Sequence, residues 1–162
     1  MVNHEEFLSL IKSNEAIIWK FSNIYSMDTD EQKDLYQDIV YQIWRSFPKF
    51  NRQSKWSTWM YRIALNTALM HERKKHKIKP TVDLSQVLHI SATGANQEED
   101  ERIKQMYQQI EQLSKIEKGL VCLYLEGKSY DEISEITGFS NSNVGTRLSR
   151  IKAKLKENLI NH

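Results

Sequence analysis

The sequence has few of the residues that interrupt helices. Its 162 residues include 5 glycines and 2 prolines. Because these two residue types are the strongest local breakers of regular structure, their scarcity favours long helices. Hydrophobic residues make up 40% of the chain and charged residues 27%, as in an ordinary globular protein. The composition therefore predicts an all-α fold, arranged as one domain or two small ones.

Cysteine occurs once, at Cys122, which excludes an internal disulfide and a metal site built from several cysteines. The residue lies in an apolar run, so we expect a buried and unreactive thiol. Long apolar runs are also lacking, and the first residues, Met1–Glu6, contain no basic segment. We therefore expect neither a signal peptide nor a membrane span, and a cytoplasmic protein.

Side chains that bind metals or catalyse reactions form no convincing pattern. The 5 histidines show no ligand spacing on one helical face. One alternative is a helical enzyme that holds a metal at the carboxylates of Glu98–Glu101, but neighbouring side chains point in different directions around a helix. An acidic helix start, favoured by the helix dipole, explains this run better. We expect no catalytic residues, no cofactor, no metal and no small-molecule substrate.

Charge is distributed unevenly, although the formal net charge is only +2. Between Asp28 and Asp38 five acidic side chains accompany a single lysine. Between Lys49 and Lys79 nine basic side chains accompany a single glutamate. Near-neutrality is therefore a cancellation between an acidic segment and a basic one.

Hydrophobic periodicity predicts helices in both halves of the chain, with an interruption between them. The predicted helices are 5–25, 30–47, 56–75, 99–113 and 115–125, followed by a helical pair near the C-terminus. All four tryptophans lie in the first half, which indicates a separate core there. We expect two small helical domains, 1–77 and 99–162, joined by a flexible linker over 78–98.

The segment Tyr130–Arg150 is typical of a helix–turn–helix, in which two short helices at a fixed angle bring one of them into the major groove of DNA. Gly138 stands where the first helix must end in a left-handed residue. Ser140 is the expected N-cap of the second helix. The residues expected to form the shared core are Ile133, Ile136, Phe139, Val144, Leu148 and Ile151.

The second helix of this pair has an inward apolar stripe and an outward polar face. At about 100° per residue the polar side chains gather opposite Val144, Leu148 and Ile151. Arginine and asparagine on such a face suit the edges of guanine and adenine. The alternative is an ordinary surface helix with solvated basic residues. The candidate DNA-binding residues are Ser142, Asn143, Thr146, Arg147, Arg150 and Lys154.

Two further blocks precede the helix–turn–helix: Asp34–Trp44, and Phe50 followed by Trp56–Asn66. In this order the three blocks resemble the extracytoplasmic-function sigma factors, the small promoter-specificity subunits of bacterial RNA polymerase. The resemblance implies that the first domain binds the β′ clamp of the polymerase core and opens the minus-ten promoter element. It implies that the second domain reads the minus-thirty-five element and contacts the β flap. Members of the family are usually held inactive by an anti-sigma factor, so we expect one here.

The resemblance assigns roles to the acidic helix and to the segment after it. The acidic helix would meet basic residues of the polymerase, although the segment taken alone indicates a solvated acidic face. The residues implied in polymerase binding are Asp34, Gln37, Asp38 and Tyr41. The loop and the asparagine that follow would hold an extruded base, and the later basic residues would hold phosphates. The residues implied in minus-ten binding are Asn51, Arg52, Gln53, Ser54, Lys55, Trp56, Asn66, Arg73, Lys74 and Lys75. For Trp56 a core role is an open alternative, whereas Trp59 and Ile63 are expected in the core.

The sequence also departs from the family pattern. The position before Thr146, commonly basic, is Gly145, and glycine inside a helix costs about 1 kcal/mol relative to alanine. A Leu-Pro pair that often opens an earlier helix is replaced by Leu113–Ser114. A stand-alone helix–turn–helix regulator remains the alternative function, but it gives no reason for the acidic and aromatic-basic blocks.

Overall fold

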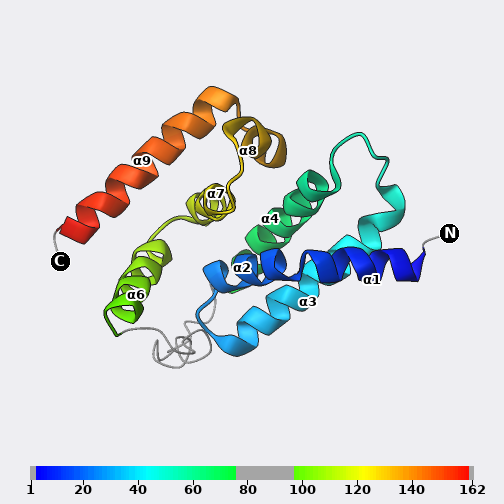
Figure 1. The fold of residues 1–162 in the computed structure, drawn as a ribbon, viewed down its shortest axis with the longest axis horizontal. Coiled ribbons are helices and arrows are strands. Elements are labelled where there is room, and N and C mark those ends of the chain that lie inside the picture. Colours follow the sequence, from blue (N-terminus) through cyan, green and yellow to red (C-terminus); the bar gives the residue numbers. More distant parts are fainter. Residues whose placement is uncertain (1–2, 76–96, 161–162) are drawn as a thin grey trace.

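The chain folds into helices joined by short turns in the part that the structure, a computed structural model, describes (Figure 1). That part comprises residues 3–75 and 97–160, without the side chains of 72–75, 97, 99 and 158–160. The elements are α1 (His4–Ser13), α2 (Glu15–Tyr25), α3 (Thr29–Ser46), the 3-10 turn η1 (Phe47–Lys49), α4 (Trp56–Lys75), α6 (Gln97–Glu111), α7 (Lys115–Leu125), α8 (Tyr130–Thr137) and α9 (Asn141–Ile160). The expected all-α class is confirmed. The predicted linker lies mostly outside the described residues, and its last two residues, 97 and 98, begin α6.

The N-terminal helices α1–α4 share one core. Leu35, Ile39 and Ile43 recur along α3 at helical spacing and are completely buried against α2 and α4. Phe21 of α2 and Tyr61 of α4 meet in the same core, with ring centroids 5.8 Å apart. This burial turns the opposite, acidic side of α3 outward. Trp59 and Ile63, which we expected in the core, are only partly buried and pack against its edge.

The single helix predicted over 5–25 is wrong at one point, because the chain breaks at Asn14. The Asn14 side chain donates to the carbonyl of Leu10 at 2.7 Å, and the Ser13 hydroxyl donates to the carbonyl of Ser9 at 2.9 Å. Serine and asparagine compete in this way with the regular helical hydrogen bonds. Asn14 consequently ends α1 and begins α2.

The C-terminal helices α6–α9 have well-satisfied ends. Ser114 and Ser129 each form a capping box with the glutamate three residues later, Glu117 and Glu132. Gly138 ends α8 with φ 83°, a left-handed conformation that glycine adopts without a steric penalty. Such caps satisfy backbone groups that a helix end otherwise leaves without partners.

The two groups of helices pack directly on each other. α7 contacts α2 and α4, and α8 contacts α4 (Figure 1). Two hydrogen bonds cross this interface: the Tyr25 hydroxyl donates to the Lys115 carbonyl at 2.7 Å, and Arg62 donates to the Glu135 carbonyl at 2.7 Å. Lys20 and Glu126 also pair across it, with Nζ and Oε1 2.6 Å apart.

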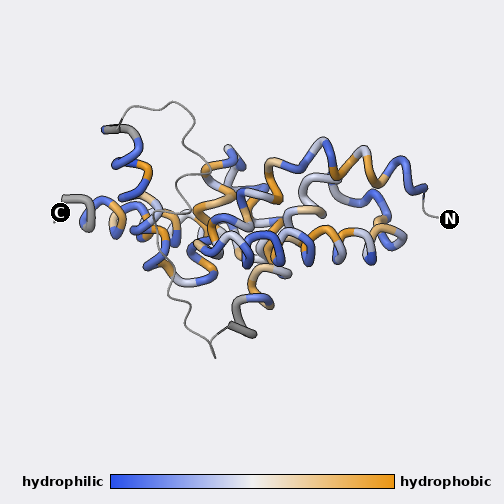
Figure 2. The backbone as a smooth tube through the Cα atoms, turned by 90° about the horizontal axis from the view of Figure 1, so that it is seen from below, coloured by the Kyte–Doolittle hydropathy of each residue, from blue (hydrophilic) through white to orange (hydrophobic). Residues whose placement is uncertain are grey.

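Hydrophilic and hydrophobic residues alternate along the helices, as Figure 2 shows by the change of colour along the tube. This pattern is that of amphipathic helices that bury one side against their neighbours. Within residues 3–75 and 97–160, no helix combines the length and the apolar character that crossing a bilayer requires.

Candidate nucleic-acid interface

The helix–turn–helix has the geometry that its sequence predicts. Ile133, Val144 and Leu148 are at most 1% exposed and join α8 to α9. The Ser140 hydroxyl accepts a hydrogen bond from the backbone N–H of Asn143 at 3.2 Å, so Ser140 caps α9 as expected. Because α8 and α9 are anchored in one small core, the outward face of α9 is held at a fixed angle to α8.

The predicted reading residues lie along that outward face. Ser142, Thr146 and Arg150 are exposed, and the Thr146 hydroxyl donates to the carbonyl of Ser142 at 3.0 Å. Lys154, one turn further, is exposed and lies 3.7 Å from Glu117 of α7, measured from Nζ to Oε1. The structure therefore brings Ser142, Thr146 and Arg150 to one side of the helix, whereas Lys154 lies on its flank, next to α7.

Asn143 and Arg147 form a pair on the flank of this face. The Arg147 Nε donates to the Asn143 Oδ1 at 3.0 Å, and the guanidinium lies 4.3 Å from the centroid of the Phe139 ring. A cation over an aromatic face is attracted by the ring quadrupole. The arginine is thus held in one orientation beside the exposed side chains.

Gly145 lies beside Tyr130 of α8. A methyl group placed on Gly145 would be 3.5 Å from the Tyr130 ring, which is an ordinary contact distance. The glycine is therefore not required by close packing at this position. Gly145 therefore leaves this half-buried position beside Tyr130 without a side chain.

The loop between η1 and α4 is shaped by its own polar side chains. The Asn51 Oδ1 accepts a hydrogen bond from the backbone N–H of Gln53 at 3.1 Å. Arg52, between them, has φ 61° and is the one non-glycine residue with positive φ among the described residues. An L-residue in this region carries a strain of about 1–2 kcal/mol. Asn51, Arg52, Gln53 and Lys55 are exposed, and Ser54 is half-buried.

Aromatic rings gather at the base of this loop. Phe50 and Trp56 meet edge to face with centroids 5.5 Å apart, and Trp56 and Trp59 lie 5.0 Å apart. Phe47 meets Trp56 edge to face at 5.7 Å. The Trp56 Nε1–H is buried without a hydrogen-bond partner. Such a group is unfavourable until an acceptor forms a hydrogen bond with it.

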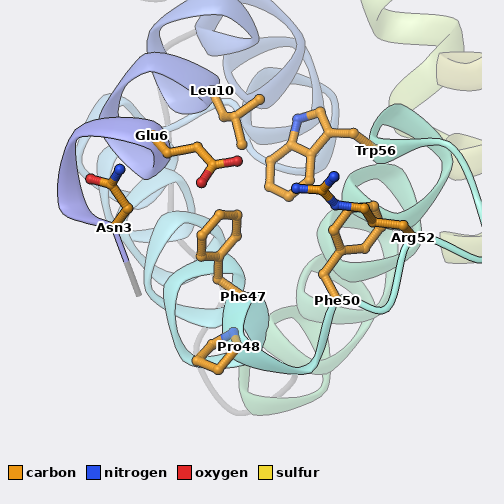
Figure 3. A pocket seen from close by; sticks show the side chains of 8 residues that line it. All are labelled: Asn3, Glu6, Leu10, Phe47, Pro48, Phe50, Arg52 and Trp56. Atoms are coloured by element: carbon orange, nitrogen blue, oxygen red, sulfur yellow. The ribbon is translucent and has the colours of Figure 1, made fainter. Parts of the chain in front are cut away.

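A cavity of about 380 Å³ opens between this aromatic cluster and α1 (Figure 3). Its lining residues are Asn3, Glu6, Leu10, Phe47, Pro48, Phe50, Arg52 and Trp56. Figure 3 shows the Glu6 carboxylate and the Arg52 guanidinium extending into it from opposite sides. The cavity thus combines flat apolar walls with polar groups, among them the Glu6 carboxylate as an acceptor and the Arg52 guanidinium as a donor.

Sequence reasoning found only part of this cavity. It named Arg52 and Trp56, and missed the contribution of α1, which comes from some fifty residues earlier in the chain. Asn66, expected at the same pocket, is exposed on α4 and is not one of the residues that line the cavity. Arg73, Lys74 and Lys75 end α4, but their side chains lie outside the described residues.

The acidic side of α3 forms a second exposed surface. Asp34, Gln37 and Asp38 are exposed, and Tyr41 on the next turn is 58% exposed. The Asp38 Oδ2 lies 3.1 Å from Nδ1 of His71 on α4. The predicted polymerase-binding residues therefore share one face, and one of them is oriented by a neighbouring helix.

No group of three or more histidine, cysteine, aspartate or glutamate side chains is arranged to hold a metal ion within the described part of the chain. Cys122 is 1% exposed, and burial raises the pKa of its thiol to about 12. A thiol with such a pKa is protonated at neutral pH and therefore a poor nucleophile. The expected burial of this cysteine is confirmed.

Comparison with known proteins identifies the two groups of helices. Residues 10–78 match the family model described as "Sigma-70 region 2", and residues 103–155 match "Sigma-70, region 4". Together the two matches cover about three quarters of the chain.

Curated proteins with similar sequences bear related names. The chain is 28% identical to the RNA polymerase sigma factor YlaC of Bacillus subtilis, over 90% of this chain and 86% of that protein. It is 28% identical to the ECF RNA polymerase sigma factor SigW of the same organism, over 80% of this chain and 75% of that protein.

A solved structure shares the arrangement of helices. The sigma factor RpoE of Bartonella quintana, in complex with the anti-sigma factor NepR, superposes with a TM-score of 0.73 at 20% identity. That superposition covers 96% of this chain and 97% of the RpoE chain.

The chain belongs to the sigma-70 family and, within it, to the extracytoplasmic-function group of sigma factors for transcription initiation. Members of this family are in general not enzymes. The resemblance seen in the sequence is therefore confirmed at the level of the family.

Proposed function

We propose that the protein binds the RNA polymerase core and holds two promoter elements with two separate surfaces. The observation that carries this proposal is the pair of polar surfaces on one chain. One is the regular outward face of α9, and the other is the strained loop 51–55 beside an aromatic cavity. A regulator that binds duplex DNA unaided needs only the first.

The outward face of α9 reads the minus-thirty-five element as duplex DNA. Thr146 and Arg150 are exposed there, and an arginine side chain can form hydrogen bonds with both O6 and N7 of guanine. Arg147 is already oriented by Asn143 and Phe139, so it loses less conformational freedom on binding. Ser142 and Lys154 extend the contact to the phosphates on either side.

The loop 51–55 and its cavity take up the minus-ten element once it is single-stranded. An unstacked base gains aromatic surface from Phe50 and Trp56, and base–aromatic stacking contributes about 1–3 kcal/mol per base. A base edge also supplies the acceptor that the buried Nε1 of Trp56 lacks. Beyond the cavity the strand passes Asn66 and then Arg73, Lys74 and Lys75, which lie further along α4.

The acidic face of α3 binds the β′ clamp. Its carboxylates complement basic residues on the polymerase, and Tyr41 adds an exposed aromatic anchor. The C-terminal helices contact the β flap, and an anti-sigma factor competes for these surfaces. The protein acts in the cytoplasm, where polymerase and DNA are, and it has no catalytic residue, cofactor or small-molecule substrate of its own. Domains 1–77 and 99–162 divide this work, with 78–98 as the linker.

An electrophoretic shift on promoter DNA, measured with and without core polymerase, tests the proposal. We expect specific retardation only when core polymerase is present. A variant with Asp34→Lys and Gln37→Lys serves as a control, because it reverses the charge of the clamp face and leaves α9 intact. Tight sequence-specific binding by the free protein contradicts the proposal and supports a stand-alone regulator.

A further inference from the structure

Asn143 lies in the first turn of α9, the part of the helix that is nearest the bases in the proposed complex. In a helix–turn–helix the N-terminal residues of the second helix contact base edges in the major groove. The backbone N–H of Asn143 donates to the hydroxyl of Ser140, the N-cap, at 3.2 Å, and the side chain is half-buried. The cap therefore fixes the position of Asn143, and the hydrogen bonds of its amide group decide what it offers to a base.

The amide oxygen of Asn143 already has a partner. Oδ1 accepts a hydrogen bond from Nε of Arg147, one turn further along α9, at 3.0 Å. Because an arginine nitrogen only donates, the oxygen and not the amide nitrogen must face it. Asparagine reads adenine by accepting from N6 and donating to N7 at the same time. Asn143 could do so only by giving up its bond with Arg147, so the group that it offers to a base is the Nδ2 donor.

Phe139 holds Arg147 in the orientation that this bond requires. The arginine Cζ lies 4.3 Å from the centroid of the Phe139 ring, where the ring quadrupole attracts the cation. The ring belongs to the turn between α8 and α9 and packs against the buried core. With Nε engaged, the remaining hydrogen-bonding groups of Arg147 are the donors on its two Nη atoms. Asn143 and Arg147 thus form a donor pair, two neighbouring side chains that both offer N–H groups to the DNA.

The four bases differ in how well their major-groove edges suit this donor pair. Guanine presents two acceptors, N7 and O6, and thymine presents the acceptor O4, so neither brings a donor to that edge. Adenine carries its N6 amino group beside N7, and cytosine presents only its N4 amino group. Two donors that face each other lack an acceptor, which costs free energy once water is excluded. The donor pair therefore favours guanine, and then thymine, over adenine and cytosine.

We propose that Asn143 is a specificity-determining residue that selects guanine, or less strongly thymine, at one position of the minus-thirty-five element. It acts as a hydrogen-bond donor, with Arg147 and Phe139 as positioning residues. This role rests on the function proposed above, in which α9 reads the element as duplex DNA. It replaces the pairing with adenine that an asparagine on this helix suggests from sequence alone, because the sequence does not show that Arg147 engages the amide oxygen.

Selection of DNA by the holoenzyme, assembled from core polymerase and the full-length protein, tests this role. The DNA library is randomised across the minus-thirty-five region of one promoter that the holoenzyme recognises. For the unmodified protein we expect guanine or thymine to be favoured roughly tenfold over cytosine at the position that Asn143 faces. Asn143→Asp keeps one oxygen for Arg147 and replaces the amide donor with a second oxygen. Because a carboxylate accepts from N4 of cytosine, this variant should prefer cytosine at the same position.

The control variants separate base reading from charge and from packing. Asn141→Asp introduces the same charge in the same turn of α9, outside the donor pair, so it should change the amount of DNA retained but not the base preferences. Phe139→Leu keeps an apolar side chain and removes the ring, so Asn143 regains access to adenine and the preference at its position should broaden. Phe139→Tyr keeps the ring and should retain the preference of the unmodified protein.

Nuclear magnetic resonance of the free protein checks the donor pair without polymerase or DNA. The Nε–H of Arg147 should exchange with water roughly tenfold faster in Asn143→Ala than in the unmodified protein, because its acceptor is gone. Phe139→Leu should also raise this rate, whereas Phe139→Tyr should not. Thermal unfolding shows whether each variant is folded at the temperature of the measurement.

The outcomes distinguish this role from the function on which it rests. The role is overturned if the holoenzyme selects a minus-thirty-five sequence and Asn143→Asp selects the same one. It is also overturned if the position that responds to Asn143 carries adenine or cytosine with the unmodified protein, or if the Arg147 Nε–H exchanges equally fast in every variant. A holoenzyme that selects no minus-thirty-five sequence contradicts the proposed function itself, and the exchange rates then show separately whether the donor pair exists in the free protein.

Discussion

The loop 51–55 and the helix–turn–helix are both proposed to bind DNA, but they differ in backbone strain and in how well their polar groups are hydrogen-bonded. In the helix–turn–helix the left-handed residue is glycine and the helix starts are capped by Ser129 and Ser140. In the loop the left-handed residue is Arg52, and the buried Nε1 of Trp56 has no partner. One region is locally satisfied, and the other retains strain and an unmet hydrogen bond.

The difference follows from the form of DNA that each region is proposed to bind. A duplex presents its base edges at fixed positions, so a rigid reading face matches it with little loss of conformational freedom. A melted strand forms only if the free energy that its bases gain from contacts with the protein exceeds the free energy of base pairing. A site whose polar groups lack hydrogen-bond partners in the free protein gains the most free energy when the strand binds.

The largest expected effect comes from damaging the rigid region. Ile133 is completely buried between α8 and α9, so Ile133→Ala should lower the free energy of unfolding by about 2–5 kcal/mol. Urea unfolding followed by circular dichroism measures this loss. The exposed change Lys156→Ala is the control, and a loss for Ile133→Ala no larger than for that control would mean that this core does not position α9.

Trp56→Ala should affect DNA opening at the strained region more than it affects folding stability. It should weaken open-complex formation by about 1–3 kcal/mol for one stacked base. Because the indole Nε1 has no partner, the loss of folding stability should be smaller than for a fully satisfied buried tryptophan. Permanganate reactivity of promoter thymines measures opening.

Asn66→Ala is the companion change for the same step and should impair opening while leaving polymerase binding intact. If Asn66→Ala instead abolished polymerase association, Asn66 would belong to the clamp surface and not to the path of the strand. Equal permanganate reactivity in Trp56→Ala and the unmodified protein would remove the indole from the minus-ten site.

Arg150→Ala tests the reading face directly. The side chain is exposed on α9, and its removal should weaken selection of the minus-thirty-five element by about 1–3 kcal/mol. Competition between promoters with intact and altered elements measures the selection. Lys152→Ala on the same helix is the comparison, since Lys152 lies over the Tyr124 ring and not on the proposed reading face. An equal effect of the two changes would indicate a purely electrostatic contribution.

The smallest expected effect concerns the caps. Ser129→Ala should cost about 1 kcal/mol of stability at neutral pH. Hydrogen bonds from Ser129 lower the pKa of Glu132 below its ordinary value of 4.5. A lowered folded-state pKa adds stability above pH 4.5 and loses it as the pH falls through the lowered value. Glu132→Ala removes the carboxylate that accepts a hydrogen bond from the Ser129 backbone N–H, so this variant should lose that part of the pH dependence, as measured by thermal unfolding. An unchanged pH dependence in Glu132→Ala would speak against the capping box.

Most helices could be predicted because the signals that set them are local. The sparse glycines and prolines leave long amphipathic runs, and Gly138 and Ser140 mark the turn of the helix–turn–helix without reference to the rest of the chain. The break at Asn14 carries a local signal as well, in the pair Ser13–Asn14, but the apolar residues on either side continue the helical pattern and conceal it.

The cavity and the domain contact could not be predicted, because both join residues far apart in sequence. Glu6 and Leu10 reach the loop only after α1 folds back along the aromatic cluster. Gly119 hints at a close approach, since glycine weakens the helix that contains it. No periodicity tells which residue of another helix lies opposite, and here it is Leu65.

The left-handed backbone of Arg52 links the folding stability of the protein to its proposed activity. Glycine at this position would relieve the strain and stabilise the folded chain, yet it would remove the guanidinium that extends into the cavity. Under the proposed function, selection for a more stable protein and selection for promoter opening therefore favour different residues at position 52. Among descendants of this sequence, we expect glycine at position 52 to accompany higher thermal stability and a narrower set of promoters that melt.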